Sequence, residues 1–455
     1  MSRELLLDAA ARAVRYLESL DARRVQPDAA GLAGIAAWDE RLPDGPADPH
    51  EVLRRLDDVG SPATMAMAGP RFFGFVIGGA LPVTVAANWL ATAWDQNTAF
   101  YHPTPATAEI ERVALRWLVD ILGLPADCEG AFVTGATVAN LTALAAARHQ
   151  VLERAGWDVE ADGLFGAPPI TVVVGEEVHP TLLKSLGVLG LGRTRVKRVP
   201  VDGQGRLRAD ALPPLQDPTI LCLQAGNVNT GACDPLAEVI PVARAAGAWV
   251  HVDGAFGLWA AAAPARRHQV AGIEGADSWA VDAHKWLNVP YDCGLAFVRD
   301  GRALGAAMAV RAAYLPADSP RIPSDFTPEL SRRARGVEVW AALRTLGRSG
   351  IADMIERCCG HAARFATGLA DAGHQVLNEV ALNQVLVSFG SPEITERTIA
   401  LVQTDGTCWC GGTVWQGRTA MRISVCSWAT TAADVELSLE AILRAAAQAK
   451  AEAGK

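Results

Sequence analysis

A lysine at the end of an apolar strand is the residue in this sequence best suited to covalent chemistry. Lys285 lies in the run DSWAVDAHKWLNVPYDCG, directly after His284 and before Trp286. Lysine is rarely buried without a reason, and desolvation favours the neutral amine, which is the form that attacks a carbonyl to make an imine. The alternative is a surface lysine with a buried stem, which the apolar strand and the aromatic neighbour disfavour.

A carboxylate stands at the end of a second apolar strand, in the run WVHVDGAFG. Asp253 ends this strand and is followed by Gly254 and Ala255. An ionised carboxylate there can pair with a protonated ring nitrogen, and Ala255 is small enough to let a flat ring approach. Taken alone, an aspartate in this place is more often the N-cap of a helix.

Two further runs could bind a phosphate and a flat ring. VTGATVANLTAL predicts a strand, a tight turn at Gly135 and Ala136, and a helix that begins near Thr137. Free amide N–H groups at a helix N-terminus, with a hydroxyl beside them, form a site for a phosphate dianion. EEVHPTLLKSLGVLG places His179 between a strand and a helix, where an imidazole can stack on a planar cofactor. Each run also has an ordinary structural explanation, as a strand-to-helix turn and as a structural histidine.

The elements that must position these residues alternate between strand and helix. From about residue 71 to residue 300, short β-branched runs such as TVVVG, TILCLQ and GLAFV alternate with Ala-rich helical stretches. This alternation predicts an α/β fold with a mostly parallel sheet and helices on both faces. We therefore expect a large domain over residues 71–340 that carries all four runs.

Three other segments do not follow this alternation. Residues 1–70 have a helical period and predict an N-terminal helical segment. Residues 311–335 contain four prolines and little period, which favours a long functional loop. Residues 341–455 begin with a helical run and then mix helices with strands such as QVLVSFG, which predicts a smaller C-terminal α+β domain.

Length and composition narrow the classes of protein. A chain of 455 residues with 50% hydrophobic and 20% charged residues is globular and long enough for two or three domains. A net charge of -9 without a basic tract argues against nucleic-acid binding. The most apolar window, residues 255–263, is far short of the roughly 20 residues of a membrane span. Nine cysteines without a CxxC pair or a Cys/His cluster argue against disulfides and metal, so we expect the reducing cytoplasm.

In this order and spacing, the four runs resemble the group II pyridoxal-dependent decarboxylases, which include aromatic-L-amino-acid, histidine and glutamate decarboxylases. The resemblance extends from RFFGFVIGG to MRISVCSWATTAADVE and is most specific over residues 251–298. It implies fold type I of the PLP-dependent transferases, with a seven-stranded sheet in the large domain, and pyridoxal 5'-phosphate (PLP) as cofactor. It also implies a homodimer in which the N-terminal segment packs on the partner.

The resemblance assigns a role to each residue. Lys285 would hold PLP as a Schiff base, Asp253 would pair with the pyridine nitrogen, and His179 would stack on the ring. The phosphate would be held by Gly135, Ala136, Thr137 and His284. Asn227, in the GNVNTG turn, would lie near the ring, and Arg422 would be structural or would orient a carboxylate.

One position on the predicted loop bears on the type of reaction. Tyr314, in RAAYLPADSP, matches the tyrosine that in this family returns a proton to Cα after carbon dioxide leaves. Phenylalanine at that position is associated with oxidative chemistry that forms an aldehyde. The resemblance therefore favours decarboxylation of an L-amino acid to the amine, and the alternative is a tyrosine packed at the base of a loop.

The substrate and some alternative reactions stay open. Asn97 and Ala99 fall where aromatic decarboxylases have apolar pocket wall, and Gly78 falls where they have a larger residue. These three positions leave the side chain of the substrate undecided. A PLP lyase or aldolase, an aminotransferase, an aldehyde-forming enzyme and a protein without turnover also stay open, because one fold supports many activities.

Overall fold

A computed structural model describes residues 3–310 and 321–454, and the chain forms two compact units. The larger unit consists of Ala80–Gly360 and Asn378–Gln384. The smaller unit consists of Met1–Gly79, His361–Leu377 and Val385–Lys455. The predicted large domain thus falls mostly within the larger unit, whereas the predicted N-terminal and C-terminal segments share the smaller one.

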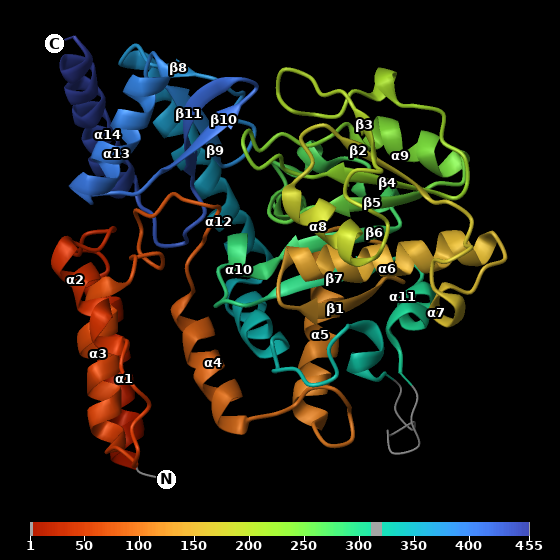
Figure 1. Ribbon diagram of the computed structural model, residues 1–455, viewed down its shortest axis with the longest axis horizontal. Coiled ribbons are helices and arrows are strands. Elements are labelled where there is room, and N and C mark those ends of the chain that lie inside the picture. Colours follow the sequence, from red (N-terminus) through yellow and green to blue (C-terminus); the bar gives the residue numbers. More distant parts are fainter. Residues whose placement is uncertain (1–2, 311–320, 455) are drawn as a thin grey trace. The chain divides into compact units, whose positions relative to one another are not determined.

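A seven-stranded sheet forms the centre of the larger unit (Figure 1). β7 runs antiparallel to both of its neighbours and the other strands are parallel, so the predicted mostly parallel sheet is confirmed. Strands such as β4 and β6 are buried along their whole length, which explains their nearly continuous apolar sequences. In order across the sheet the strands are β1 (Glu129–Val133), β7 (Gly294–Val298), β6 (Ser278–Asp282), β5 (Trp249–Asp253), β4 (Thr219–Gln224), β2 (Thr171–Gly175) and β3 (Lys197–Val199).

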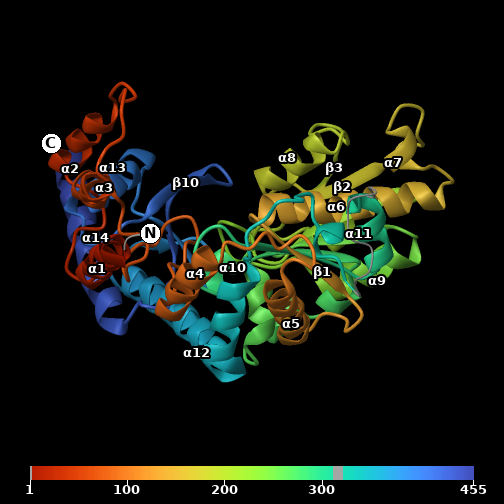
Figure 2. The same cartoon turned by 90° about the horizontal axis from the view of Figure 1, so that it is seen from below.

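Helices cover both faces of this sheet. Figure 2 shows α6 and α8 on one side of the strands and α5 on the other. The α-helices of this unit are α4 (Pro82–Trp94), α5 (Pro105–Ile121), α6 (Ala136–Arg154), α7 (Val159–Asp162), α8 (Pro180–Val188), α9 (Leu236–Ala245), α10 (Ala283–Trp286), α11 (Gly301–Met308) and the first part of α12 (Gly336–Asp371). Its short 3-10 helices are η2 (Ala209–Ala211), η3 (Gly257–Ala262), η4 (Arg267–Val270), η5 (Ile273–Gly275) and η6 (Pro323–Phe326).

The long helix α12 contains a break. Gly347 has φ 59° and ψ -175°, a backbone conformation that glycine adopts at little cost, so two helical segments meet there. The first segment corresponds to the helical run that the sequence predicts after the loop. Residues 311–320 of that predicted loop lie outside the described residues, and the part that follows contains η6.

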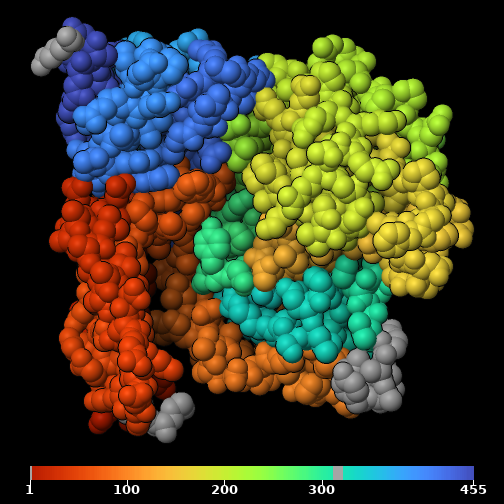
Figure 3. All heavy atoms as spheres, in the orientation of Figure 1, coloured from red at the N-terminus to blue at the C-terminus, as the bar shows by residue number. Residues whose placement is uncertain are grey.

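The smaller unit contains helices from the beginning of the chain together with a second sheet. Its antiparallel sheet has the order β10 (Gly411–Trp415), β11 (Arg418–Ser424), β9 (Gln384–Ser388) and β8 (Gln375–Val376). Its helices are α1 (Arg3–Ser19), α2 (Ala29–Gly34), η1 (Ile35–Trp38), α3 (Pro49–Ala63), the last part of α12, α13 (Pro392–Asp405) and α14 (Ala432–Ala453). α1 and α3 lie side by side (red in Figures 1 and 3), and an ion pair of 3.0 Å between Arg12 and Asp57 joins them.

No helix within residues 3–310 and 321–454 combines the length and the apolar character that crossing a bilayer requires.

Candidate active site

The first two turns of α6 contact two buried carboxylates at the C-terminal edge of the large sheet. The backbone N–H of Ala136 donates to Oδ1 of Asp282 at 2.6 Å. The side-chain amide of Asn140 donates to Oδ2 of Asp253 at 3.1 Å. Residues four apart lie on one face of a helix, and the C-terminal ends of parallel strands lie at one edge of a sheet. The start of α6 therefore faces the end of β5 and the end of β6 together.

Lys285 lies beside the second of these carboxylates. It is in α10, which begins directly after β6, and its Nζ is 3.1 Å from Oδ2 of Asp282. One fifth of its side chain is exposed, whereas the Asp282 side chain is nearly fully buried. The amine is therefore held at the sheet edge by an ion pair and is still accessible to a small molecule.

His284 is a neutral imidazole with a defined tautomer. Its Nδ1 accepts a hydrogen bond from the backbone N–H of Cys293 at 3.1 Å, so the ring proton is on Nε2. Nε2 is 3.5 Å from Oδ1 of Asp282, and the ring stacks on Tyr291 with centroids 4.3 Å apart. Burial lowers the pKa of His284, although Asp282 acts to raise it. His284 can therefore present an N–H donor beside the start of α6.

The turn before α6 depends on close backbone approach. A Cβ at Gly294 would lie 2.4 Å from the backbone of Gly135, which is closer than real side chains come. A Cβ at Gly135 would lie 3.2 Å from Cε1 of His284. The turn thus packs tightly against β7 and His284, as a backbone that must approach a ligand requires. Thr137 is half-buried, and its carbonyl accepts a hydrogen bond from Ser185 of α8 at 2.8 Å.

His179 is the N-cap of α8. Its Nδ1 accepts from the backbone N–H of Thr181 at 3.3 Å and lies 2.6 Å from the Thr181 hydroxyl. α8 follows β2, which is separated from β5 by β4 in the sheet. The stacking role of His179 remains a prediction.

Asn227 has a structural task that the sequence did not reveal. Its Oδ1 accepts from the backbone N–H groups of Asn229 at 2.8 Å and Thr230 at 3.2 Å. Its amide donates to Oε2 of Glu177 at 2.9 Å. These bonds close the GNVNTG turn and join it to the segment before His179, and its expected position near the ring remains a prediction.

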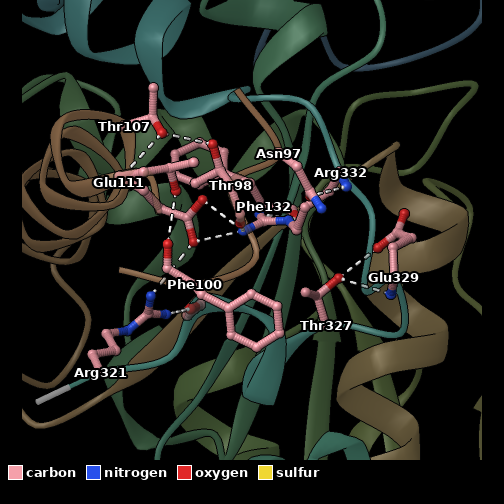
Figure 4. A network of polar contacts seen from close by, with 12 residues as sticks. Asn97, Thr98, Phe100, Thr107, Glu111, Phe132, Arg321, Thr327, Glu329 and Arg332 are labelled. Carbon is pink, nitrogen blue, oxygen red and sulfur yellow. Dashed lines mark hydrogen bonds and ion pairs between the residues drawn. The ribbon is translucent and has the colours of Figure 1, made fainter. Parts of the chain in front are cut away.

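Asn97, an exposed residue, contacts a polar network whose centre is the buried pair of Glu111 and Arg332 (Figure 4), and the predicted substrate residue Ala99 lies two positions further along the chain. Oδ1 of Asn97 accepts from the backbone N–H of Arg332 at 2.9 Å, and Ala99 is fully buried with its carbonyl bonded to the N–H of Ser324 at 3.1 Å. The guanidinium of Arg332 pairs with Glu111 at 2.8 Å. The network fixes residues 97–99 against the segment that follows the undescribed residues.

The remaining predicted residues fall in the smaller unit, outside the described residues, or beside Asp253. Gly78 and Arg422 belong to the smaller unit, where burial lowers the pKa of Arg422. Tyr314 lies outside the described residues. Ala255 has its backbone N–H bonded to Oδ1 of Asp253 at 3.2 Å, and its methyl group is partly exposed at the end of β5.

Two residues of the site were missed by the sequence reasoning. Asn140 is inside the VTGATVANLTAL run, one helical turn after the predicted phosphate turn. This spacing places it on the same helix face as Ala136 and could have indicated that it belongs to the site. Asp282 is inside the lysine run, three residues before Lys285, and its place at the end of an apolar strand gives no separate signal.

Comparisons with known proteins match this arrangement. The family described as "Pyridoxal-dependent decarboxylase conserved domain" matches residues 34–390. The chain belongs to the pyridoxal-dependent decarboxylase family. PLP is therefore the cofactor of this family member, and the predicted family and cofactor are confirmed.

Individual relatives are distant. The aromatic-L-amino-acid decarboxylase of Bacillus atrophaeus is 28% identical over 330 residues, which are 70% of this chain and 66% of the relative. The L-2,4-diaminobutyrate decarboxylase of Rhizobium meliloti is 28% identical over 421 residues, 86% of this chain and 81% of the relative. The tryptophan decarboxylase 1 of Oryza sativa subsp. japonica is 29% identical, and the match spans 62% of its length.

Solved structures share the fold. The crystal structure of Oryza sativa TDC with PLP and tryptamine superposes with a TM-score of 0.89 at 24% identity, over 98% of this chain and 97% of that one. The likeness confirms fold type I for this family member.

The residues of the larger unit fit PLP at three points. Asp253 is a nearly fully buried carboxylate whose two oxygens each receive one N–H donor, which suits it to a protonated ring nitrogen. The Lys285 amine lies at the adjacent strand end. The start of α6, where the N–H of Ala136 donates to Asp282 and would have to exchange partners, and Nε2 of His284 are N–H groups that a phosphate could use.

Proposed function

We propose that this chain removes the α-carboxylate of an L-amino acid as carbon dioxide and releases the amine. The observation that carries the proposal is that α6 contacts Asp253 through Asn140 and Asp282 through Ala136, while Asp282 pairs with Lys285. These contacts bring the Lys285 amine and the Asp253 carboxylate to the same edge of the sheet. Family membership supports PLP as the cofactor that they would hold.

PLP, when bound, supplies an aldehyde that an amine can capture and a pyridinium ring that accepts electrons. Lys285 would hold the cofactor, after its amine leaves the ion pair with Asp282. Asp253 would keep a proton on the ring nitrogen. The amides of Ala136 and Thr137, with Nε2 of His284, would hold the phosphate.

The substrate is the least constrained part of this proposal. Relatives are named for decarboxylation of aromatic amino acids, diaminobutyrate and histidine, so their names do not select one side chain. Gly78, Asn97 and Ala99 remain the predicted pocket residues.

Trapping of carbon dioxide from a panel of L-amino acids, with the amine measured in parallel, tests the reaction. Transfer of the amino group to a keto acid without release of carbon dioxide would favour an aminotransferase. Cleavage of a bond at Cβ would favour a lyase or an aldolase.

Tyr314 is the residue that we expect to decide whether the product is an amine or an aldehyde. Named relatives include a 4-hydroxyphenylacetaldehyde synthase of Rhodiola rosea, 26% identical over 77% of this chain, so both outcomes occur among relatives. We propose that the Tyr314 hydroxyl protonates Cα after carbon dioxide leaves. Tyr314→Phe should retain the cofactor and lower amine formation by about 10² to 10⁴, with aldehyde as the product to measure. Amine formation at the wild-type rate would instead favour His179 or Lys285 as the acid.

We also propose a homodimer. α1 and α3 contain no buried residue, and their apolar side chains Leu6, Leu7, Val52 and Leu56 are about half exposed or more. A second copy would cover this surface and make its burial favourable. Sedimentation at working concentration tests this, and an active monomer would contradict it.

All nine cysteines carry free thiols, and a cytoplasmic location remains a proposal.

A further inference from the structure

A row of buried polar side chains extends from Asp253 into the sheet. Asn140 of α6 contacts Asp253 at 3.1 Å and Nε2 of His251 at 2.8 Å. Nδ1 of His251 lies 2.9 Å from the hydroxyl of Ser278, which is 2.9 Å from the indole nitrogen of Trp249. Asn140, His251 and Ser278 have no exposed surface, so each polar atom of the row depends on its neighbour.

The Asp253 end fixes the direction of the hydrogen bonds in the row. A carboxylate can only accept, so the Asn140 amide N–H donates to Asp253, and Oδ1 of Asn140 accepts from Nε2 of His251. A neutral His251 with its proton on Nε2 then accepts at Nδ1 from the hydroxyl of Ser278. The indole N–H of Trp249 can only donate, and the Ser278 oxygen can accept it while its own proton goes to His251, so the other end is compatible with this direction.

The row does not carry a net charge of its own. Burial lowers the pKa of His251 to about 3, so this histidine is neutral at ordinary pH. The backbone N–H of Ala255 donates to the other oxygen of Asp253 at 3.2 Å. Asp253 thus accepts hydrogen bonds from neutral donors at both of its oxygens.

We propose that Asn140, His251 and Ser278 are positioning residues that hold Asp253 as an oriented carboxylate and so keep a proton on the ring nitrogen of bound PLP. The part that concerns PLP rests on the proposed function, whereas the hydrogen-bond direction does not. The row passes no proton along its length. Its effect on Asp253 should therefore weaken with each step away from that residue.

The first test measures the direction in the wild-type protein. In the holoenzyme with isotope-labelled histidine, nitrogen NMR should show His251 as the neutral ring with its proton on Nε2. Its signal should not titrate between pH 5 and pH 9, and His251→Gln identifies it. A proton on Nδ1, or a titration in this range, overturns the proposed direction.

The second test grades the row by substitution. With PLP labelled at the ring nitrogen, Asn140→Leu should move the nitrogen signal furthest toward the unprotonated form, corresponding to a fall of about 1 in the pKa of that nitrogen. His251→Leu and Ser278→Ala should have progressively smaller effects, and Trp249→Phe the smallest. His251→Gln keeps one donor and one acceptor and should restore most of the wild-type signal.

Trp279→Phe is the matched control for loss of packing. Trp279 is a fully buried tryptophan of the neighbouring strand β6, and its indole N–H donates to the carbonyl of Ile273 at 3.0 Å, outside the row. It should lower thermal stability about as much as Trp249→Phe and leave the ring-nitrogen signal unchanged. If Asn140→Leu and Trp279→Phe move the signal equally, the row is only packing and the inference fails. A protein that keeps these signals but decarboxylates no amino acid would overturn the proposed function alone.

Discussion

The two carboxylates at the edge of the large sheet are buried to a similar degree and are stabilised in different ways. Asp253 is 6% exposed and receives hydrogen bonds from two neutral groups, the Asn140 amide and the backbone N–H of Ala255. Asp282 is 2% exposed and is paired with the cation of Lys285, beside His284. Neutral donors leave a full negative charge for an incoming cation, whereas an internal cation already neutralises the charge. Asp253 is arranged to receive a cation, and Asp282 to release one.

The largest expected effect comes from removing that cation. Lys285→Ala should abolish the covalent, borohydride-reducible link to PLP, because Lys285 supplies the amine at this strand end, and it should leave Asp282 as an unpaired buried carboxylate. Reduction followed by peptide mass spectrometry measures the link. Reduced cofactor still trapped on the same peptide of the variant would contradict the assignment.

A smaller effect should distinguish the two carboxylates at the ring nitrogen. Asp253→Asn removes the negative charge and should lower the pKa of that nitrogen by about 1 to 3, because a nearby opposite charge shifts a pKa by this amount. Asp282→Asn should leave it nearly unchanged. Nitrogen NMR of labelled cofactor measures both, and equal shifts in the two variants would show that the carboxylates are interchangeable.

Asp282→Asn should instead change the affinity for phosphate. The Asp282 carboxylate accepts from the backbone N–H of Ala136 at the start of α6, where a phosphate dianion would compete with it and be repelled. We expect pyridoxine 5'-phosphate to bind about tenfold more tightly to the variant, or by about 1.4 kcal/mol, and pyridoxine to bind equally to both proteins. These two analogues lack the aldehyde, so an imine with Lys285 does not contribute to either affinity.

Asp277→Asn is the matched control for that measurement. Asp277 precedes β6 at its opposite end and accepts from the backbone N–H of Val250 at 2.8 Å. Its substitution should leave both affinities unchanged. If it tightens phosphate binding as much as Asp282→Asn does, the effect arises from net charge rather than from the contact with α6.

The sequence predicted the parts of this site that are local. An apolar strand followed by a polar residue is visible in one short run, so Asp253, Lys285 and the turn at Gly135 could be predicted, and the structure brings Asp253 and Lys285 to neighbouring strand ends. The mostly parallel sheet followed from alternation alone. The grouping of the N-terminal helices with the C-terminal sheet in one compact unit depends on long-range contacts, which have no local pattern.

The contacts that separate the two carboxylates could not be predicted in this way. Asn140 is a polar residue in an Ala-rich helix, and only the packing of α6 on β5 brings its amide to Asp253. Asp282 reads as the end of a strand, and its ion pair depends on Lys285 turning back within α10. His251 reads as one residue of a strand, and its partners lie on α6 and β6.

The smallest effect that we predict is a difference in acid stability between the two ends of the site. Burial lowers the pKa of His251, behind Asp253, to about 3, and lowers that of His284, where Asp282 partly opposes the shift. A histidine with a lower pKa in the folded protein than in the unfolded chain adds stability that is fully present above about pH 6.5 and is lost as the pH falls toward the folded value. With a pKa of about 3 in the folded protein and about 6.5 in the unfolded chain, protonation of His251 should lower the unfolding free energy by about 2 kcal/mol between pH 7 and pH 5.

Denaturant unfolding of the cofactor-free protein at both pH values measures this loss. His251→Gln should remove most of it and His284→Gln less, because Asp282 opposes the lowering of the His284 pKa, whereas burial lowers the His251 pKa without opposition. An equal loss in both variants would mean that the neutral donors around Asp253 and the charged pair at Asp282 do not set different environments for their histidines.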